Sequence, residues 1–282
     1  MTDAYRFDES STEKAIAYAK IYAGTNYSPA METVLKVAFS EKRNLPTFRL
    51  KSSDTILLSG YMKKWVGAYL AGYNNRPSVR TGNCSGTHPD PMAKTILRAR
   101  IPGLENNLAD KIVAGHSLLM TIENNIGELL EEYLAVKLSP LGWYCCWGST
   151  IDAVDFCKAD GSLLQIKTSD NSENSSSSRV RQGTPIEKWF RRFSRRPGVY
   201  NWESLNRMLG RPGYVSESDF RAFAEKTIAA NPACIYIAAN HRPPGGCTPK
   251  LPGALARVIF IPDRGRAIFP AGKRWGSCPY GS

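Results

Sequence analysis

The sequence lacks the signals that would assign the chain to a membrane or a secretory pathway. No uncharged apolar run approaches the ~20 residues that a membrane-spanning helix needs. The segment from Met1 to Arg6 has neither the basic region nor the apolar region of a signal peptide. We therefore expect a cytoplasmic protein without a membrane partner.

Paired metal ligands are also missing. The seven cysteines include no C-x-x-C pair, and the three histidines lie far apart in the sequence. Because a structural zinc site shows ligand pairs at short spacing, a zinc centre is not expected. Free, mostly buried thiols in a reducing compartment are the better interpretation.

Acidic residues are scarce relative to basic ones, and the net charge is +12. Residues 167–213 hold ten Lys/Arg against four Asp/Glu, and residues 242–274 hold seven against one. The rest of the chain carries twenty charges of each sign. Two concentrated basic segments suit nucleic acid, because each neutralised phosphate releases condensed counterions. The alternative is a basic face that contacts only solvent.

The chain is long enough for one large domain or two small ones. Apolar residues recur at helical spacing through much of residues 1–120, and a long helical pattern runs from about 107 to 139. A break near Gly115 or Gly127 is left open. Strand patterns follow Pro140. We expect a helical N-terminal region over 1–120, for dimerisation or DNA contact, and an α/β domain over 121–282.

Local signals give the order of elements after Pro140. Asp160-Gly161 lies between two apolar runs and predicts a hairpin. Pro185 suits the first turn of a helix over 185–196, and Ser216 begins a capping box. The expected strands are 143–147, 154–157, 163–167, 234–238 and 257–261, and further helices are expected at 201–209 and after Ser216.

One group of residues at this hairpin has the chemistry of phosphodiester hydrolysis. Gln165 and Lys167 share a strand face, because side chains alternate along a strand, and Asp155 lies across the turn. The Asp155 carboxylate and the Gln165 amide oxygen are ligands suited to Mg²⁺, and Lys167 would orient water and stabilise developing charge. A structural ion pair between Asp155 and Lys167 explains the spacing equally well.

The spacing Asp-x9-Gln-x-Lys resembles the motif of PD-(D/E)XK nucleases, with two departures. Val154 replaces the proline, and Gln165 replaces the second carboxylate, which leaves the site one negative charge short. In that nuclease fold a glutamate from the helix before the first strand commonly enters the site. Glu131 is the candidate here, as a catalytic residue and metal ligand, and Glu128 on the same helix face is the alternative. Glu132 is expected to face solvent.

A longer series of segments resembles the SinI family of type II restriction endonucleases, over about residues 90 to 210. The serine tract and the Lys-Trp-Phe-Arg element are more distinctive than the catalytic triplet. In order, the segments are 125–135, Gly142-Trp143, Trp147-Gly148, 153–156, 164–167, the serine-rich tract 170–178, Arg181, Gly183-Thr184 and 188–191.

This resemblance implies a fold, an activity and partners. The fold would be an α/β, PD-(D/E)XK restriction-endonuclease-like mixed sheet flanked by helices. The enzyme would be a bacterial homodimer that makes Mg²⁺-dependent double-strand cuts at a short palindromic site. In this family the usual site is GGWCC, cut to leave a short 5′ overhang. A cognate DNA methyltransferase would protect the host DNA.

The segment after Lys167 supplies candidate contacts to double-stranded DNA. Short hydroxyl side chains can approach bases closely, arginines suit guanine edges, and the later basic residues suit phosphates. Trp189 and Phe190 are expected in the core, and a mobile linker is the alternative for the serine tract. The candidates are Ser176, Ser177, Ser178, Arg179, Arg181, Lys188, Arg191, Arg192 and Arg195, followed by Arg196 and by a second group of Arg264, Arg266, Lys273 and Arg274.

Two other functions fit the same residues. A repair or recombination nuclease that recognises DNA structure would use the same fold with a different substrate. A non-catalytic DNA-binding protein would explain Gln165 as the mark of a decayed site. Cleavage of branched DNA in preference to plain duplex, or activity created by Gln165→Glu, would identify these alternatives.

Overall fold

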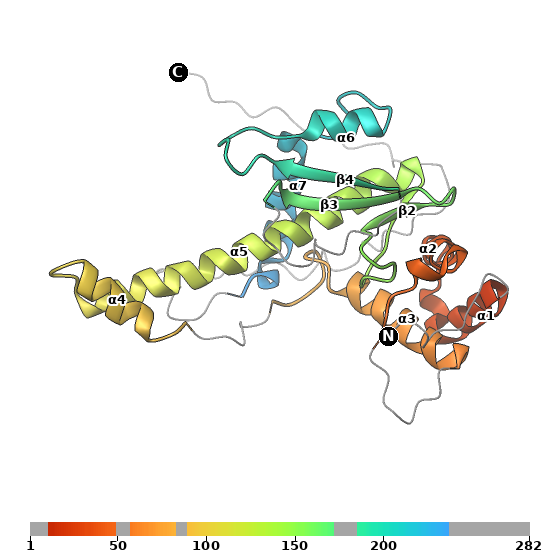
Figure 1. The fold of residues 1–282 in the computed structure, drawn as a ribbon, viewed down its shortest axis with the longest axis horizontal. Helices are drawn as coiled ribbons and strands as arrows, with labels where there is room; N and C mark the ends of the chain where they lie inside the picture. Colours follow the sequence, from red (N-terminus) through yellow and green to blue (C-terminus); the bar gives the residue numbers. More distant parts are fainter. Residues whose placement is uncertain (1–10, 49–56, 83–88, 172–184, 237–282) are drawn as a thin grey trace, which may run out of the picture. The chain divides into compact units, whose positions relative to one another are not determined.

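The structure is a computed structural model that describes residues 11–48, 57–82, 89–171 and 185–236 (Figure 1). The chain divides into two units, Met1–Asn240 and His241–Ser282, and every described residue belongs to the first. The strand expected at 257–261 lies outside the described residues, as do residues 172–178 of the serine tract, Arg179, Arg181 and the C-terminal basic group.

Most described residues before the sheet are helical, as the apolar spacing predicts. Ser28 caps the second helix through a hydrogen bond from the Met31 amide, and Ser216 caps the last helix through the Asp219 amide at 3.1 Å. None of the described helices is long and apolar enough to cross a membrane. The α-helices are α1 (Thr12–Ala23), α2 (Pro29–Ser40), α3 (Leu58–Asn74), α4 (Met92–Arg100), α5 (Asn106–Leu138), α6 (Trp202–Met208) and α7 (Glu217–Ala230).

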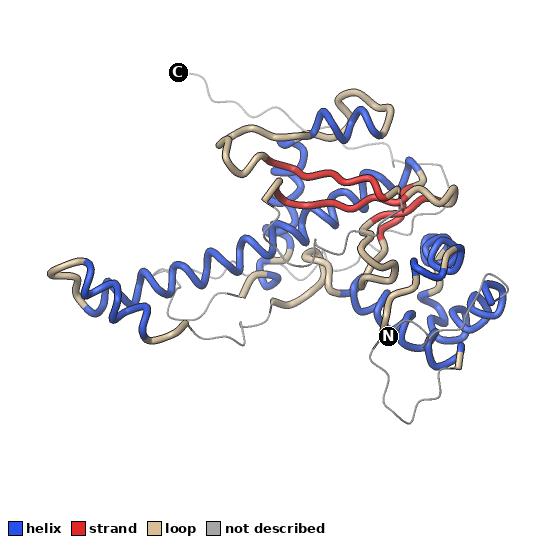
Figure 2. Tube along the Cα trace, in the orientation of Figure 1, coloured by secondary structure: helices blue, strands red, loops and turns tan. Residues whose placement is uncertain are grey.

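The described strands form one mixed sheet in the order β1-β2-β3-β4 (Figure 2). Strands β1 and β2 are antiparallel, as are β2 and β3, whereas β3 and β4 are parallel. A mixed sheet with helices against it confirms the expected α/β class. The strands are β1 (Trp143–Cys145), β2 (Phe156–Lys158), β3 (Leu163–Ser169) and β4 (Ile186–Arg192).

The Asp-Gly turn joins β2 to β3 as predicted. The Gly161 amide donates to the Lys158 carbonyl at 3.0 Å, and the Lys158 amide donates to the Ser162 carbonyl at 3.0 Å. Gly161 has φ +87°, a conformation that glycine adopts without a Cβ clash. The Asp160 carboxylate accepts from the Ser162 amide at 2.9 Å and fixes the turn. This local geometry sets the register of β3, and with it the positions of Gln165 and Lys167.

Two helices pack directly against the sheet. Helix α5 packs against β1 and β3, and α2 packs against β1 and β2. The Tyr133 ring of α5 contacts the rings of Trp202, Phe220 and Phe223, which joins α5 to α6 and α7. The N-terminal helices share this core, because the buried Trp65 indole of α3 donates to the Thr150 carbonyl at 2.9 Å.

The helix predicted at 185–196 is wrong, because residues 186–192 form strand β4. Trp189 and Arg191 are buried while Lys188 and Arg192 are exposed, which is the two-residue period of a strand. The tertiary partner decides the conformation, because β4 hydrogen-bonds in parallel with β3 along its length. Burial of Trp189, which is 1% exposed, confirms its expected place in the core.

The structure settles one open point and changes one smaller expectation. Helix α5 is continuous from 106 to 138, with no break at Gly115 or Gly127. Residues 234–236 form no strand, because Cys234 ends a 3-10 helix that begins at Pro232, and residues 237–238 lie outside the described ranges. The free, buried thiols expected from the sequence are confirmed for the four described cysteines, Cys145, Cys146, Cys157 and Cys234.

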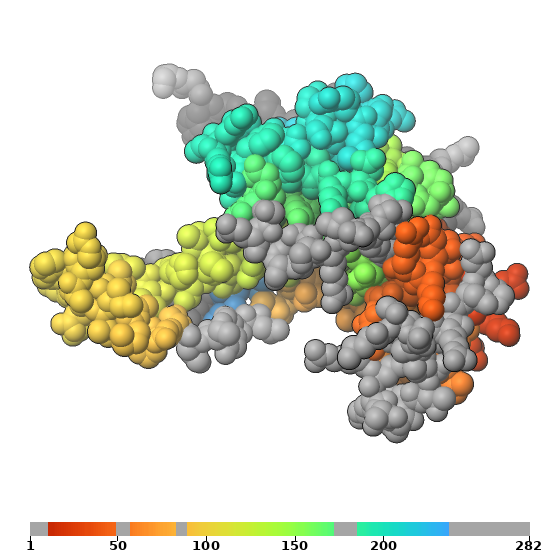
Figure 3. Space-filling model, viewed as in Figure 1, coloured from red at the N-terminus to blue at the C-terminus, as the bar shows by residue number. Residues whose placement is uncertain are grey.

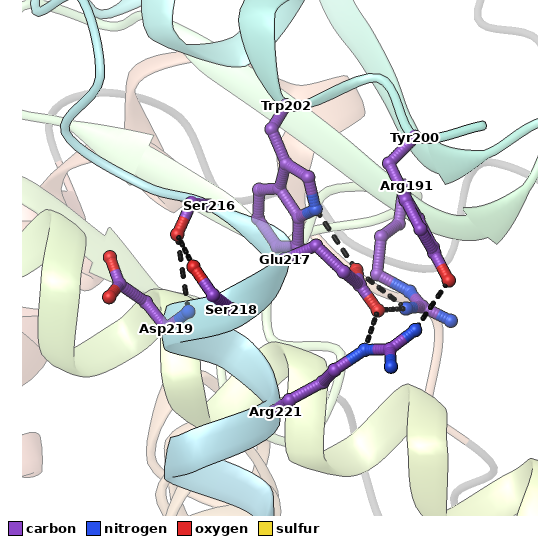
Figure 4. Close-up of polar contacts among 8 residues, drawn as sticks. All are labelled: Arg191, Tyr200, Trp202, Ser216, Glu217, Ser218, Asp219 and Arg221. Atoms are coloured by element: carbon purple, nitrogen blue, oxygen red, sulfur yellow. Dashed lines mark hydrogen bonds and ion pairs between the residues drawn. The ribbon is translucent and has the colours of Figure 1, made fainter. Parts of the chain in front are cut away.

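Glu217 at the start of α7 connects three elements through one carboxylate (Figure 4). Arg191 of β4 donates to both of its oxygens, at 2.8 and 2.9 Å, and the Trp202 indole of α6 donates at 3.0 Å. Arg221 donates to the same carboxylate at 3.0 Å and also contacts Tyr200. The Arg191 and Glu217 side chains are only 9% and 16% exposed, so this pair orients β4 against the helices.

Candidate active site

Asp155 occupies the position just before β2, where the ladder between β2 and β3 ends. Its backbone amide donates to the Leu164 carbonyl at 3.0 Å, and its carboxylate Oδ2 accepts from the Ile166 amide at 2.7 Å. The side chain therefore takes the place of a strand carbonyl and lies along the sheet rather than on either face. Both faces of the sheet can supply a neighbour to this carboxylate.

Glu131 reaches the site from helix α5. Its carboxylate Oε1 accepts a hydrogen bond from the Cys145 thiol of β1 at 3.3 Å. Burial raises the pKa of the Glu131 carboxyl, and the negative charges of Asp155 and, less strongly, of Glu128 raise it further. The structure therefore brings together the two carboxylates that the sequence singled out.

Both carboxylates hold protons more tightly than usual. Burial first, and then repulsion by Asp155, raises the pKa of Glu131 to about 7. Burial raises the pKa of Asp155 to about 6, although the Ile166 amide and the Lys167 charge act in the opposite direction. A buried pair of this kind favours either a shared proton or a bound cation.

Lys167 and Gln165 lie on the sheet face opposite α5. Register places Cys145, Phe156 and Leu164 side by side, and Cys145 faces α5, so the odd-numbered residues of β3 face away from that helix. Lys167 is near enough to Asp155 for its charge to lower the pKa of that carboxyl. Gln165 makes no side-chain hydrogen bond to another described residue, and strand register alone places it beside Lys167.

The chemistry of this donor set fits a magnesium ion. Mg²⁺ prefers oxygen ligands and commonly uses one or two carboxylates while it keeps several waters. Asp155 and Glu131 supply two carboxylates whose mutual repulsion a divalent cation would relieve. Gln165 could supply a neutral oxygen only from the opposite face of the sheet, on the side of Asp155 away from Glu131. Within the described ranges no cluster of three or more His, Cys, Asp or Glu side chains is placed to hold a metal ion. The donor set therefore has two carboxylates, one fewer than a centre built from three.

The other glutamates of α5 have different partners. Glu128 forms an ion pair with Arg80, which also donates to Asn125 at 2.6 Å. Glu132 does not face solvent as expected: it is 4% exposed and accepts hydrogen bonds from the backbone and hydroxyl of Ser78. The solvent-exposed prediction for Glu132 is wrong, because the loop after α3 folds over this side of α5.

The candidate DNA-contacting residues of β4 separate by face. Lys188 pairs in register with Gln165, and Phe190 pairs with Lys167, so both share the face of the candidate site. Lys188 and Arg192 are exposed, and Phe190 is half-buried. This face places two further cations beside Lys167, as binding of a phosphate backbone requires.

The remaining candidates lie elsewhere. Arg191 points to the opposite side of β4 and binds Glu217. Arg195 and Arg196 follow β4 in an exposed turn, where Arg196 lies over the Phe193 ring at 5.6 Å. Ser176, Ser177, Ser178, Arg179 and Arg181 lie outside the described residues.

Sequence reasoning did not assign a role to Cys145. Its thiol is buried and donates to Glu131, and burial together with the Glu131 charge raises the pKa of the thiol, so the proton stays on sulfur. Cys145 lies within the apolar run 143–147, which indicates that it is buried, but only the packing of α5 on β1 gives it this contact.

Comparison with known families places the sequence in a class of endonucleases. A sequence model of the SinI restriction endonuclease family matches residues 61–230. The chain belongs to the SinI restriction endonuclease family.

Two relatives are restriction enzymes. The chain is 44% identical over 147 residues to the type II restriction enzyme SinI of Salmonella infantis, an alignment that covers 50% of this chain and 63% of the relative. It is 42% identical over 147 residues to the type II restriction enzyme Eco47I of Escherichia coli, again over 50% and 63% of the two chains. The matched part therefore spans somewhat under two thirds of each relative.

Proposed function

We propose that this chain is a type II restriction endonuclease that makes Mg²⁺-dependent double-strand cuts in DNA. The observation that carries the proposal is the pairing of Glu131 with Asp155 beside Lys167, at the end of a hairpin in a mixed sheet. Membership of a restriction endonuclease family supports it. We assign the fold to the PD-(D/E)XK class on the spacing and placement of these residues.

Each residue has a distinct role in this proposal. Asp155, Glu131 and Gln165 would hold Mg²⁺, which supplies Lewis-acid stabilisation of charge on the phosphate. Lys167 would orient the attacking water and neutralise charge that develops on the phosphate oxygens. Cys145 would keep the Glu131 carboxylate in one orientation through its thiol hydrogen bond.

DNA would lie on the sheet face that carries Lys167. Lys188 and Arg192 would bind backbone phosphates, because both are exposed on this face. Arg195 and Arg196 would extend this contact from the turn that follows β4. Ser176, Ser177, Ser178, Arg179 and Arg181, in the chain between β3 and β4, are proposed to contact bases. Arg191 has a structural role instead, since its charge is bound to Glu217.

Further properties are proposed from the resemblance to the family. We propose a short palindromic target of the GGWCC type, a short 5′ overhang, a homodimer and a cytoplasmic bacterial location with a protective methyltransferase. Residues 121–282 would form the nuclease part. Residues 1–120 would form a helical region, although α5 crosses position 120 without a break.

The test uses the whole chain and two lysine variants. Wild-type protein should cut unmethylated DNA with Mg²⁺, and Lys167→Ala should bind the same DNA without cutting it. Lys226→Ala is the matched control, because Lys226 is an exposed lysine on α7. Cleavage by Lys167→Ala at the wild-type rate would contradict the assignment. Preference for branched over plain duplex DNA would favour the structure-specific nuclease.

A further inference from the structure

Arg80 has a largely buried side chain whose guanidinium lies against the middle of α5, the part drawn in yellow-green at the surface in Figure 3. It forms an ion pair with Glu128 and donates to the side-chain oxygen of the buried Asn125 at 2.6 Å. The Asn125 amide nitrogen donates to the Thr121 carbonyl at 2.8 Å, which turns the Asn125 oxygen toward Arg80. The Arg80 side chain is 11% exposed and that of Glu128 is 39% exposed, so the arginine is the fixed member of the ion pair.

The backbone around Arg80 is anchored by contacts other than this ion pair. The Asn231 side chain donates to the carbonyls of Pro77 and Arg80, at 2.9 and 2.8 Å. The Gly82 amide donates to the Ala233 carbonyl at 2.7 Å. An ion pair with one partly exposed member contributes only modestly to stability. The segment therefore keeps its place on α5 without the ion pair, and the ion pair points to a role beyond anchoring.

Glu128 lies one helical turn before Glu131, on the same face of α5. Residues three apart on a helix have Cβ atoms roughly 5–6 Å apart. Burial and then Asp155 raise the pKa of the Glu131 carboxyl, and the charge of Glu128 raises it further, so Glu128 acts on the candidate site. Even so, no three His, Cys, Asp or Glu side chains of the described ranges converge to hold a metal ion. The carboxylate nearest to completing the site is thus the one that Arg80 binds.

We propose that Arg80 is a positioning residue that holds the Glu128 carboxylate out of the metal site formed by Glu131 and Asp155. The inference rests on the proposed function and adds to it a residue that sets the affinity of the site for Mg²⁺. Loss of Arg80 frees a third carboxylate one helical turn from Glu131. Because a divalent cation is attracted to each nearby carboxylate, the freed charge tightens the binding of Mg²⁺.

The experiment is a calorimetric titration of the full-length protein with Mg²⁺ at pH 8, without DNA. Arg80→Gln, Glu128→Gln and the double variant form a mutant cycle. Arg80→Gln should bind Mg²⁺ about tenfold more tightly than wild type. Glu128→Gln, alone or combined with Arg80→Gln, should bind Mg²⁺ no more tightly than wild type, because the restrained carboxylate is absent. Arg98→Gln is the control, since Arg98 is an exposed arginine on α4 and its loss changes the net charge equally.

A second variant loosens Arg80 while it leaves every charge in place. Asn231→Ala removes the two hydrogen bonds to the backbone around Arg80. This variant should also bind Mg²⁺ more tightly than wild type, and Glu128→Gln added to it should cancel the gain. The Asn231→Ala series keeps the inference testable if urea unfolding in a chelator shows that Arg80→Gln folds poorly.

Two results would overturn the inference and leave the proposed function in place. One is an equal affinity for Mg²⁺ in wild type, Arg80→Gln and Asn231→Ala. The other is a gain in affinity that persists after Glu128 is replaced, because the gain would then come from the lost arginine charge alone. If neither wild type nor Arg80→Gln binds Mg²⁺, the proposed function fails together with the inference.

Discussion

Removal of one buried charge should make the metal-free protein more stable. In Glu131→Gln the amide oxygen can still accept the Cys145 thiol, while the group can no longer ionise. The pKa of Glu131 is about 7, against an ordinary value of 4.5, and burial is the main cause. Ionisation of the buried carboxyl therefore costs free energy that glutamine avoids.

The sign follows from proton linkage. Because the folded-state pKa is raised, the favourable contribution of the protonated carboxyl is complete below about pH 4.5 and is lost as the pH rises through 7. The loss amounts to about 3 kcal/mol for this difference in pKa. The free energy of unfolding of Glu131→Gln should thus equal that of wild type near pH 4.5 and exceed it by roughly 2–3 kcal/mol at pH 8.

The assay is urea unfolding with a chelator present, at pH 5 and at pH 8. Glu225→Gln is the control, because Glu225 is exposed on α7 and its removal should change little. Addition of Mg²⁺ at pH 8 should then raise the stability of wild type more than that of Glu131→Gln. The buried-charge reasoning is refuted if Glu131→Gln is less stable than wild type at pH 8. It is also refuted if the substitution raises the free energy of unfolding by the same amount at pH 5 and at pH 8.

The remaining predictions concern the neighbours of that carboxylate and the DNA face. Cys145→Ala should raise the pKa of Glu131 and move the acid limb of the cleavage pH profile upward, and Cys145→Ser should restore it. Gln165→Glu should tighten Mg²⁺ binding, as measured by calorimetry. If this variant cuts DNA and the wild type does not, the wild-type site is a decayed one. Lys188→Ala should weaken DNA binding and reduce its salt slope by about 1. Arg191→Ala should instead lower the free energy of unfolding by about 2–3 kcal/mol, because the largely buried Glu217 carboxylate then keeps only Trp202 and the exposed Arg221 as partners.

The parts of the site that depend on local structure could be predicted from the sequence. The Asp160-Gly161 turn fixes the register of β3, so Gln165 and Lys167 had to share a face and Asp155 had to lie near them. The approach of Glu131 depends on how α5 packs against β1. The helical spacing restricted the choice to Glu128 or Glu131, and tertiary packing chose between them.

Long-range contacts explain the failures. Residues 186–192 fit an amphipathic helix and a strand equally well, and only the parallel pairing with β3 selects the strand. Glu132 was expected to face solvent because its helix is rich in acidic residues. It is buried by Ser78, which is 54 positions away in the sequence. The local sequence pattern predicts neither the pairing of residues 186–192 with β3 nor the contact of Glu132 with Ser78.

Sequencing of DNA ends tests the central claim most directly. Unmethylated phage DNA is incubated with the purified chain and Mg²⁺, and the ends of all fragments are read. The proposed function predicts that every end falls at one repeated short palindrome, with the same 5′ overhang on both strands. Random ends, or intact DNA across a series of divalent metals while binding persists, would contradict it.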